Sequence, residues 1–81
     1  MAKHILLVDE NQKLTAAISG RLEQRGFAVQ CAHDGIAALR SIAAKPPELL
    51  LLELKLPGLH GIELIKKLRQ SPRTNKLPII V

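Results

Sequence analysis

The sequence predicts an α/β fold built on a parallel sheet, and three observations support this prediction. Short apolar runs alternate with segments whose apolar residues recur at helical spacing, in the order βαβαβαβ. The connections between them are short and are punctuated by glycine or proline. The 81 residues are 47% hydrophobic and 23% charged, a globular composition with room for one domain. Such alternation favours right-handed crossovers, with helices on both faces of the sheet.

The four expected strands differ in their apolar patterns. Residues 4–8 and 49–52 are continuous apolar runs, as in strands buried on both faces. The four leucines of 49–52 would favour a helix in isolation, but the run is short and prolines lie on both sides of it. Residues 27–32 alternate in the manner of an edge strand, and within them we expect Cys31 to be a small buried residue. Residues 77–81 begin a fourth strand.

Three amphipathic helices are expected between these strands. The first stops near Gly26, the second is capped by Asp34 and ends before two prolines, and the third spans residues 61–70. The positions that follow helical spacing are, in chain order, Leu14, Ala17, Ile18, Arg21 and Leu22; Ile36, Ala38, Leu39 and Ile42; and Ile62, Leu64, Ile65 and Leu68.

Composition also limits the cellular setting. Acidic residues soon interrupt the N-terminal apolar run, which argues against a signal peptide, and no apolar run approaches the roughly 18 residues of a membrane span. A single cysteine cannot form an internal disulfide. We therefore expect a cytoplasmic protein with no membrane contact.

The net charge of +5 is unevenly distributed, because residues 64–81 carry five lysines and arginines and no acid. Such a stretch is typical of a solvated helix face, but it could also contact nucleic acid or an acidic protein. Phe27 is the only aromatic residue, so base stacking is nearly excluded and nucleic acid is an unlikely partner.

Acidic residues follow two of the expected strands: Asp9 and Glu10 follow the first, and Glu53 follows the third. Open parallel sheets bind ligands at the carboxyl ends of their strands. If these two strands are neighbours, the three carboxylates converge, and either a cation or a retained proton must relieve their repulsion. Magnesium matches this ligand set best. Acids that only cap helices or face water are an equal alternative on the pattern alone.

Six short motifs follow one another along the chain, at residues 5–11, 26–29, 32–39, 47–52, 56–64, and 68–69 with 77–81. Together they resemble the receiver domain of bacterial response regulators, the phosphorelay modules of two-component signal transduction. The resemblance covers all 81 residues. It implies a flavodoxin-like doubly wound sheet with strand order 2-1-3-4.

The resemblance also assigns roles at the acidic rim. The family phosphorylates an aspartate after its third strand, using magnesium held by that aspartate and an acidic pair after the first strand. Asp9 and Glu10 match the pair, and Glu53 falls at the phosphoacceptor position. His60 occupies a position where the family often has aspartate. The resemblance thus implies a magnesium site at Asp9, Glu10 and Glu53, and no other cofactor.

Glutamate at position 53 departs from the family pattern. Its extra methylene carries the carboxylate roughly 1–1.5 Å further, and a misplacement of about 1 Å can slow phosphoryl transfer on the order of 100-fold. We therefore expect a degenerate receiver, or pseudo-receiver, that acts by protein contact and is not an enzyme. A receiver fragment that still accepts phosphate and a basic nucleic-acid-binding fragment are the alternatives.

The family pattern continues past the fourth strand through a hydroxyl residue, a helix, a fifth strand ending in a phosphate-binding lysine, and a final helix. The resemblance therefore implies that residues 1–81 form a receiver-like domain lacking its last helix-strand-helix. The expected partners are a histidine kinase or a downstream signalling protein. We also expect self-association or domain swapping through the exposed fourth strand and the uncovered sheet face.

Overall fold

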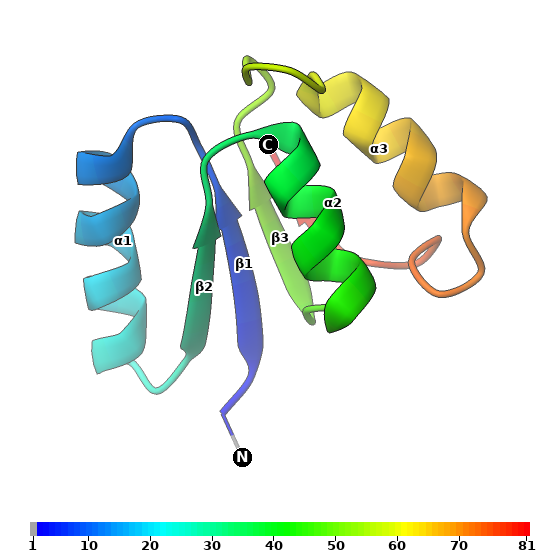
Figure 1. The fold of residues 1–81 in the computed structure, drawn as a ribbon. Helices are drawn as coiled ribbons and strands as arrows, with labels where there is room; N and C mark the ends of the chain where they lie inside the picture. Colours follow the sequence, from blue (N-terminus) through cyan, green and yellow to red (C-terminus); the bar gives the residue numbers. More distant parts are fainter. Residues whose placement is uncertain (1) are drawn as a thin grey trace.

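The computed structural model describes residues 2–81, and its elements follow the predicted order (Figure 1). The strands form one parallel sheet in the order β2-β1-β3-β4, which confirms the predicted fold class and strand order. The strands are β1 (His4–Val8), β2 (Ala28–Ala32), β3 (Leu49–Leu52) and β4 (Ile79–Ile80). The helices are α1 (Gln12–Gln24), α2 (Gly35–Ala44) and α3 (Gly61–Gln70).

β1 lies in the middle of the sheet, and all five of its residues are buried. It pairs with β2 on one side and with β3 on the other, and Val8 is level with both Ala32 and Leu52. The ladder continues one step beyond the strands, because the backbone N–H of Glu53 donates to the Val8 carbonyl at 2.9 Å. The chain therefore leaves β1 and β3 at the same level of the same sheet edge.

The main core lies between the sheet and the pair α2 and α3, which occupy one side of the molecule in Figure 1, with α1 on the other side. Leucine dominates this core because neighbouring strands supply leucines to one face. Its largest fully buried members from the sheet and the two helices are Leu6, Val8, Leu50, Ile42 and Leu64. Full burial of each such side chain stabilises the fold by about 1.5–3 kcal/mol.

The opposite face, beside α1, is covered less well, and here two expectations were wrong. Leu14 of α1 is 44% exposed, and the buried residue of that helix is Thr15. Cys31 is exposed rather than buried. Cys31 lies on β2, an edge strand whose only neighbour in the described sheet is β1. On the core side, Ile36 of α2 and Ile62 of α3 belonged to the predicted helical stripes, but they are 46% and 50% exposed.

The helix boundaries follow from capping interactions. Asn11 Oδ1 accepts a hydrogen bond from the Leu14 N–H at 3.0 Å, and Asp34 Oδ1 accepts one from the Ala37 N–H at 2.7 Å, as predicted for Asp34. α1 ends where Gly26 adopts a φ of 93°, which confirms the predicted stop.

Two glycines bring the starts of α2 and α3 against the loop that follows β3. A Cβ at Gly61 would lie 2.7 Å from the Cα of Leu54, and one at Gly35 would clash with the Leu59 carbonyl oxygen. The Gly61 N–H donates to the Leu54 carbonyl at 2.9 Å. Both helices therefore hold in place the loop that begins with Glu53.

None of the helices within residues 2–81 combines the length and apolarity that crossing a bilayer demands.

Candidate functional site

Asp9 and Glu53 are the first residues beyond two adjacent parallel strands, β1 and β3. Because Val8 is level with Leu52, the two acids leave the sheet side by side. Both line an open hollow of about 240 Å³ at the carboxyl end of the sheet. The structure thus brings together one acid from each of the two strands that the sequence singled out.

The backbone orients each of these carboxylates. Oδ1 of Asp9, which is half-buried, accepts the Asn11 N–H at 2.9 Å. Oε1 of Glu53, which is exposed, accepts the Lys55 N–H at 3.1 Å. Each carboxylate is thus tied to the second residue after it. Since an ionised carboxylate has about four acceptor positions, both keep capacity for a cation or water.

Glu10, the third predicted acid, is exposed and does not line the hollow. Across residues 2–81, histidine, cysteine, aspartate and glutamate side chains do not gather in threes as a metal-binding cluster. The acids at the hollow are therefore the pair Asp9 and Glu53, and Glu10 follows Asp9 in the sequence without lining the hollow. A pair of this kind fits magnesium, which often binds one or two carboxylates and retains several waters.

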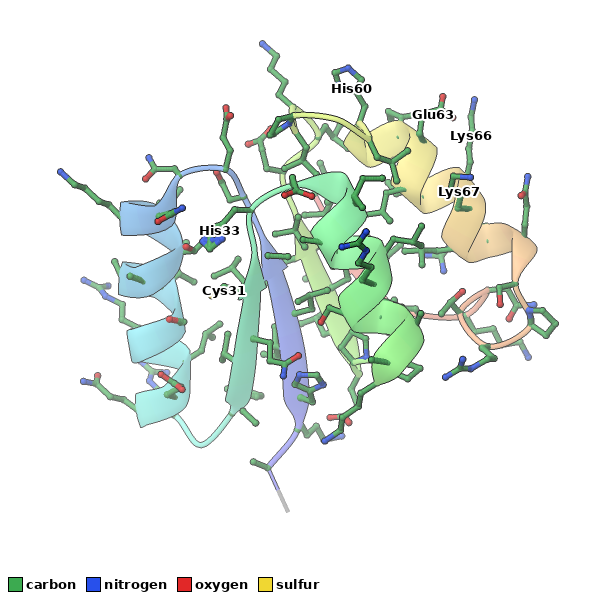
Figure 2. The ribbon with its side chains drawn as sticks, viewed as in Figure 1. Cys31, His33, His60, Glu63, Lys66 and Lys67 are labelled. Carbon is green, nitrogen blue, oxygen red and sulfur yellow. The ribbon has the colours of Figure 1, made fainter. Side chains whose placement is uncertain are left out.

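His60 does not line the hollow either. It precedes α3 without forming a side-chain cap, and Figure 2 shows its ring projecting outward from the start of that helix. His33 lies at the same end of the molecule, where its Nε2 is 3.3 Å from the hydroxyl of Thr15. This contact ties α1 to the end of β2. The one sequence signal for the contact between His33 and Thr15 is that Thr15 is a polar residue within an otherwise apolar helix pattern.

The hollow continues down the sheet face beside α1, where its lining becomes apolar. Leu7 of β1, Ile18 of α1 and Leu51 of β3 form this part. Ile80 and Val81 form its far wall and are 57% and 70% exposed. The region therefore combines an acidic rim with an accessible apolar surface.

A doubly wound parallel sheet with acids beyond two central strands defines an α/β module whose ligand site lies at the switch of strand order. Residues 5–81 match the response regulator receiver domain family, and the chain therefore belongs to that family. The receiver resemblance inferred from the motifs is thereby confirmed.

Its relatives include transcriptional and other response regulators. The phosphate regulon transcriptional regulatory protein PhoB of Rhizobium meliloti is 38% identical over all 81 residues, which cover 36% of PhoB. The response regulator MprA of Mycobacterium ulcerans is 36% identical over the same residues, which cover 34% of MprA. The chain thus spans about a third of the length of these relatives.

Solved structures show the same fold. The N-terminal domain of a response regulator receiver protein from Methanoculleus marisnigri superposes with a TM-score of 0.91 at 26% identity, over 98% of this chain and 64% of that one. The chemotaxis response regulator CheY4 of Vibrio cholerae gives a TM-score of 0.93 at 24% identity, over 98% of this chain and 66% of that one. This second likeness concerns the fold alone.

Proposed function

We propose that this chain is a pseudo-receiver: a receiver module that acts through protein contacts and forms no lasting phosphoryl adduct. The observation that carries the proposal is the position of Glu53, the first residue after β3, beside Asp9, the first residue after the paired strand β1. In the receiver resemblance, this is the position of the phosphoacceptor aspartate. Receiver domains are signalling modules rather than typical enzymes, and we propose no catalytic activity for this chain.

The geometry of Glu53 supports this. Its extra methylene moves the carboxylate away from the place that an aspartate would give it, and its Oε1 is engaged by the Lys55 N–H. Phosphoryl transfer depends on the alignment of the attacking oxygen with the phosphorus and the leaving oxygen. A carboxylate displaced by about 1 Å is a poor nucleophile on these grounds.

Magnesium belongs to the same proposal. Asp9 and Glu53 would hold the ion, water would complete its shell, and Glu10 would contribute through one of these waters. When bound, the ion supplies positive charge that offsets the carboxylates and any phosphoryl group nearby. The protein's own part is to hold the two carboxylates at one sheet edge through the Val8–Leu52 pairing.

The test is incubation with acetyl phosphate and magnesium, followed by intact mass spectrometry. We expect the natural chain to gain no lasting phosphoryl group and the Glu53→Asp variant to gain one. The matched control is Glu63→Asp, which makes the same change at an exposed residue of α3 and should behave like the natural chain.

Two results decide between the candidates. A stable phosphoryl adduct on the natural chain, mapped to Glu53 or Asp9, would overturn the pseudo-receiver proposal in favour of a phosphorylatable receiver. Labelling of Glu53→Asp that disappears when Asp9→Asn is added would support the assignment of both acids to one site.

The partners of the module follow from the same reasoning. We propose that it contacts a histidine kinase or a downstream signalling protein in the cytoplasm. A second copy of the chain is also proposed as a partner, since the accessible apolar lining beside α1 and the edge strand β4 offer a surface for association or domain swapping.

A further inference from the structure

A second, smaller hollow lies on the other side of the sheet, between the C-terminal halves of α2 and α3 and the loop after α3. In Figure 1 the C-terminal end of α2 lies at the end of the sheet opposite to the loops that follow β1 and β3, and α3 and the loop after it lie at the right of the view. The hollow measures about 120 Å³. Leu39, Ile42 and Leu68 line it with apolar groups, and Ala43, Lys67 and Arg73 are also among its lining residues.

The segments that form this hollow carry charge of one sign. Residues 35–47 and 64–81 contain no aspartate or glutamate. They contain seven of the chain's 12 lysines and arginines, and all seven are exposed. These are Arg40, Lys45, Lys66, Lys67, Arg69, Arg73 and Lys76. The apolar hollow is therefore set in a cationic surface.

The loop that forms one wall is held in place by its own contacts. The buried hydroxyl of Thr74 donates to the Leu68 carbonyl at 2.6 Å. Nη1 of Arg69 donates to the carbonyls of Thr74 and Asn75 at 3.2 and 3.1 Å. Nη1 of Arg73 donates across the hollow to the Ala43 carbonyl at 3.4 Å. A guanidinium has five N–H donors, so both arginines keep donors for a partner, and the wall is already ordered before binding.

The size of the hollow limits what it can hold. Small-molecule pockets usually measure about 300–1,000 Å³, so a hollow of about 120 Å³ is too small for a cofactor. It suits one aliphatic side chain. A rim of exposed lysine and arginine around such a notch is complementary to carboxylates on the same ligand.

We propose that this hollow docks an acidic peptide segment of a partner protein. One leucine-sized side chain of the segment enters between Leu39, Ile42 and Leu68, and its flanking carboxylates contact Lys67 and Arg73. This surface is separate from the acidic rim, so the proposal stands independently of whether Glu53 accepts phosphate.

The observations favour a protein partner over a nucleic acid. The only aromatic residue of the chain is Phe27, which does not line the hollow, so no aromatic ring is available there for a base to stack on. The apolar lining offers nothing to a phosphate backbone. In a peptide with leucine flanked by glutamate, the leucine can contact the apolar lining and the glutamates can contact the surrounding lysines and arginines.

The test uses the full chain and three fluorescein-labelled probes in anisotropy titrations: a short glutamate-rich peptide with leucine at every third or fourth position, the same peptide with serine in place of leucine, and a mixed-sequence DNA duplex. We expect the leucine peptide to bind about tenfold more tightly than the serine peptide, the gain expected for burying one such side chain. The duplex should bind more weakly than the leucine peptide.

Two variants with matched controls locate the site. Ala43→Phe fills the hollow, whereas Ala44→Phe adds the same ring to the neighbouring exposed position, which does not line it. Lys67→Glu reverses a charge at the hollow, and Lys13→Glu reverses one on α1. We expect each hollow variant to weaken binding of the leucine peptide about tenfold and each control to change it less than about threefold. Circular dichroism checks that all four variants are folded.

Three results would overturn the proposal. The first is no measurable binding of the leucine peptide. The second is equal binding of the leucine and serine peptides, or equal effects of the hollow variants and their controls. The third is that the duplex binds more tightly than the leucine peptide and that Ala43→Phe leaves the affinity for the duplex unchanged. This result would assign the cationic surface to nucleic acid.

Discussion

The pseudo-receiver proposal depends on one methylene group, the one by which Glu53 is longer than an aspartate. Glu53 keeps the negative charge that belongs at the end of β3, and its backbone N–H keeps the sheet ladder regular through the Val8 carbonyl. The change affects only the reach of the carboxylate. A substitution of this kind preserves the fold and the charge of the rim, and it changes chemistry that depends on distances of about 1 Å.

Asp34 provides a stability prediction at the same scale. Asp34→Ala removes the 2.7 Å hydrogen bond from the Ala37 N–H and leaves the first turn of α2 without a cap. We expect the free energy of unfolding to fall by about 1 kcal/mol, measured by urea denaturation. His60→Ala is the control, because His60 makes no side-chain cap at α3 and its loss should change stability by less than about 0.5 kcal/mol. Equal effects of the two substitutions would contradict this explanation.

Individual residues were predictable where a local rule governs them. Asp34 precedes a helical pattern and Gly26 follows one, and both perform the predicted capping role. Cys31 and Thr15 could not be predicted this way, because their burial depends on which helix lies over the edge strand. The sequence pattern of β2 marks two faces but does not show how completely each is covered.

At the scale of elements, the approach of α3 to the loop after β3 determines where Glu53 leaves the sheet. Gly61→Ala would place a Cβ 2.7 Å from the Cα of Leu54 and force the helix and loop apart. We expect a loss of about 1–3 kcal/mol in the free energy of unfolding.

The matched control is Gly20→Ala in α1, where an added Cβ meets nothing within 4 Å. Alanine should stabilise this helix interior by about 0.5–1 kcal/mol. Both values can be read from the same urea titrations. If the free energy of unfolding of Gly61→Ala equalled that of Gly20→Ala, the close approach of α3 to the loop after β3 would be contradicted.

Element boundaries were predicted better than element faces. The bounds of β3 and α3 agree with the predicted ranges, since prolines and glycines mark both ends of these segments in the sequence. In the predicted stripe of α1, Leu14, Ala17 and Arg21 are exposed, and Ile18 and Leu22 are half-buried. Helical spacing identifies a stripe but not the width of the surface that covers it.

For the whole molecule, the open face beside α1 predicts concentration-dependent association. Ile80 is 57% exposed at the edge of the sheet and lines the hollow there. We expect sedimentation velocity to show a shift from monomer to larger species as concentration rises. Ile80→Lys should move this shift to higher concentration.

Ile62→Lys is the control for association, because Ile62 is 50% exposed but lies on α3, outside this hollow. It should leave the association unchanged. A monomer at every concentration, or an equal response to both substitutions, would contradict self-association through this face.

The overall topology was the most predictable level, because alternation of apolar runs and helical patterns permits few arrangements. The strand order came from the receiver resemblance, and the pairing of β1 with both β2 and β3 confirms it. Convergence of Asp9 and Glu53 followed from that order. The outward position of Glu10 did not, because the first residues of a loop are not bound by strand alternation.

Whether Asp9 and Glu53 form one cation site can be tested directly. Manganese, which accepts the same oxygen ligands as magnesium, can be titrated into ¹⁵N-labelled protein while the amide signals are followed by NMR. We expect the amides of Asp9, Glu10 and Glu53 to broaden first and together, and Glu53→Gln to weaken the effect at all three. Broadening no stronger there than at Glu23, an exposed acid on α1, would contradict the shared site.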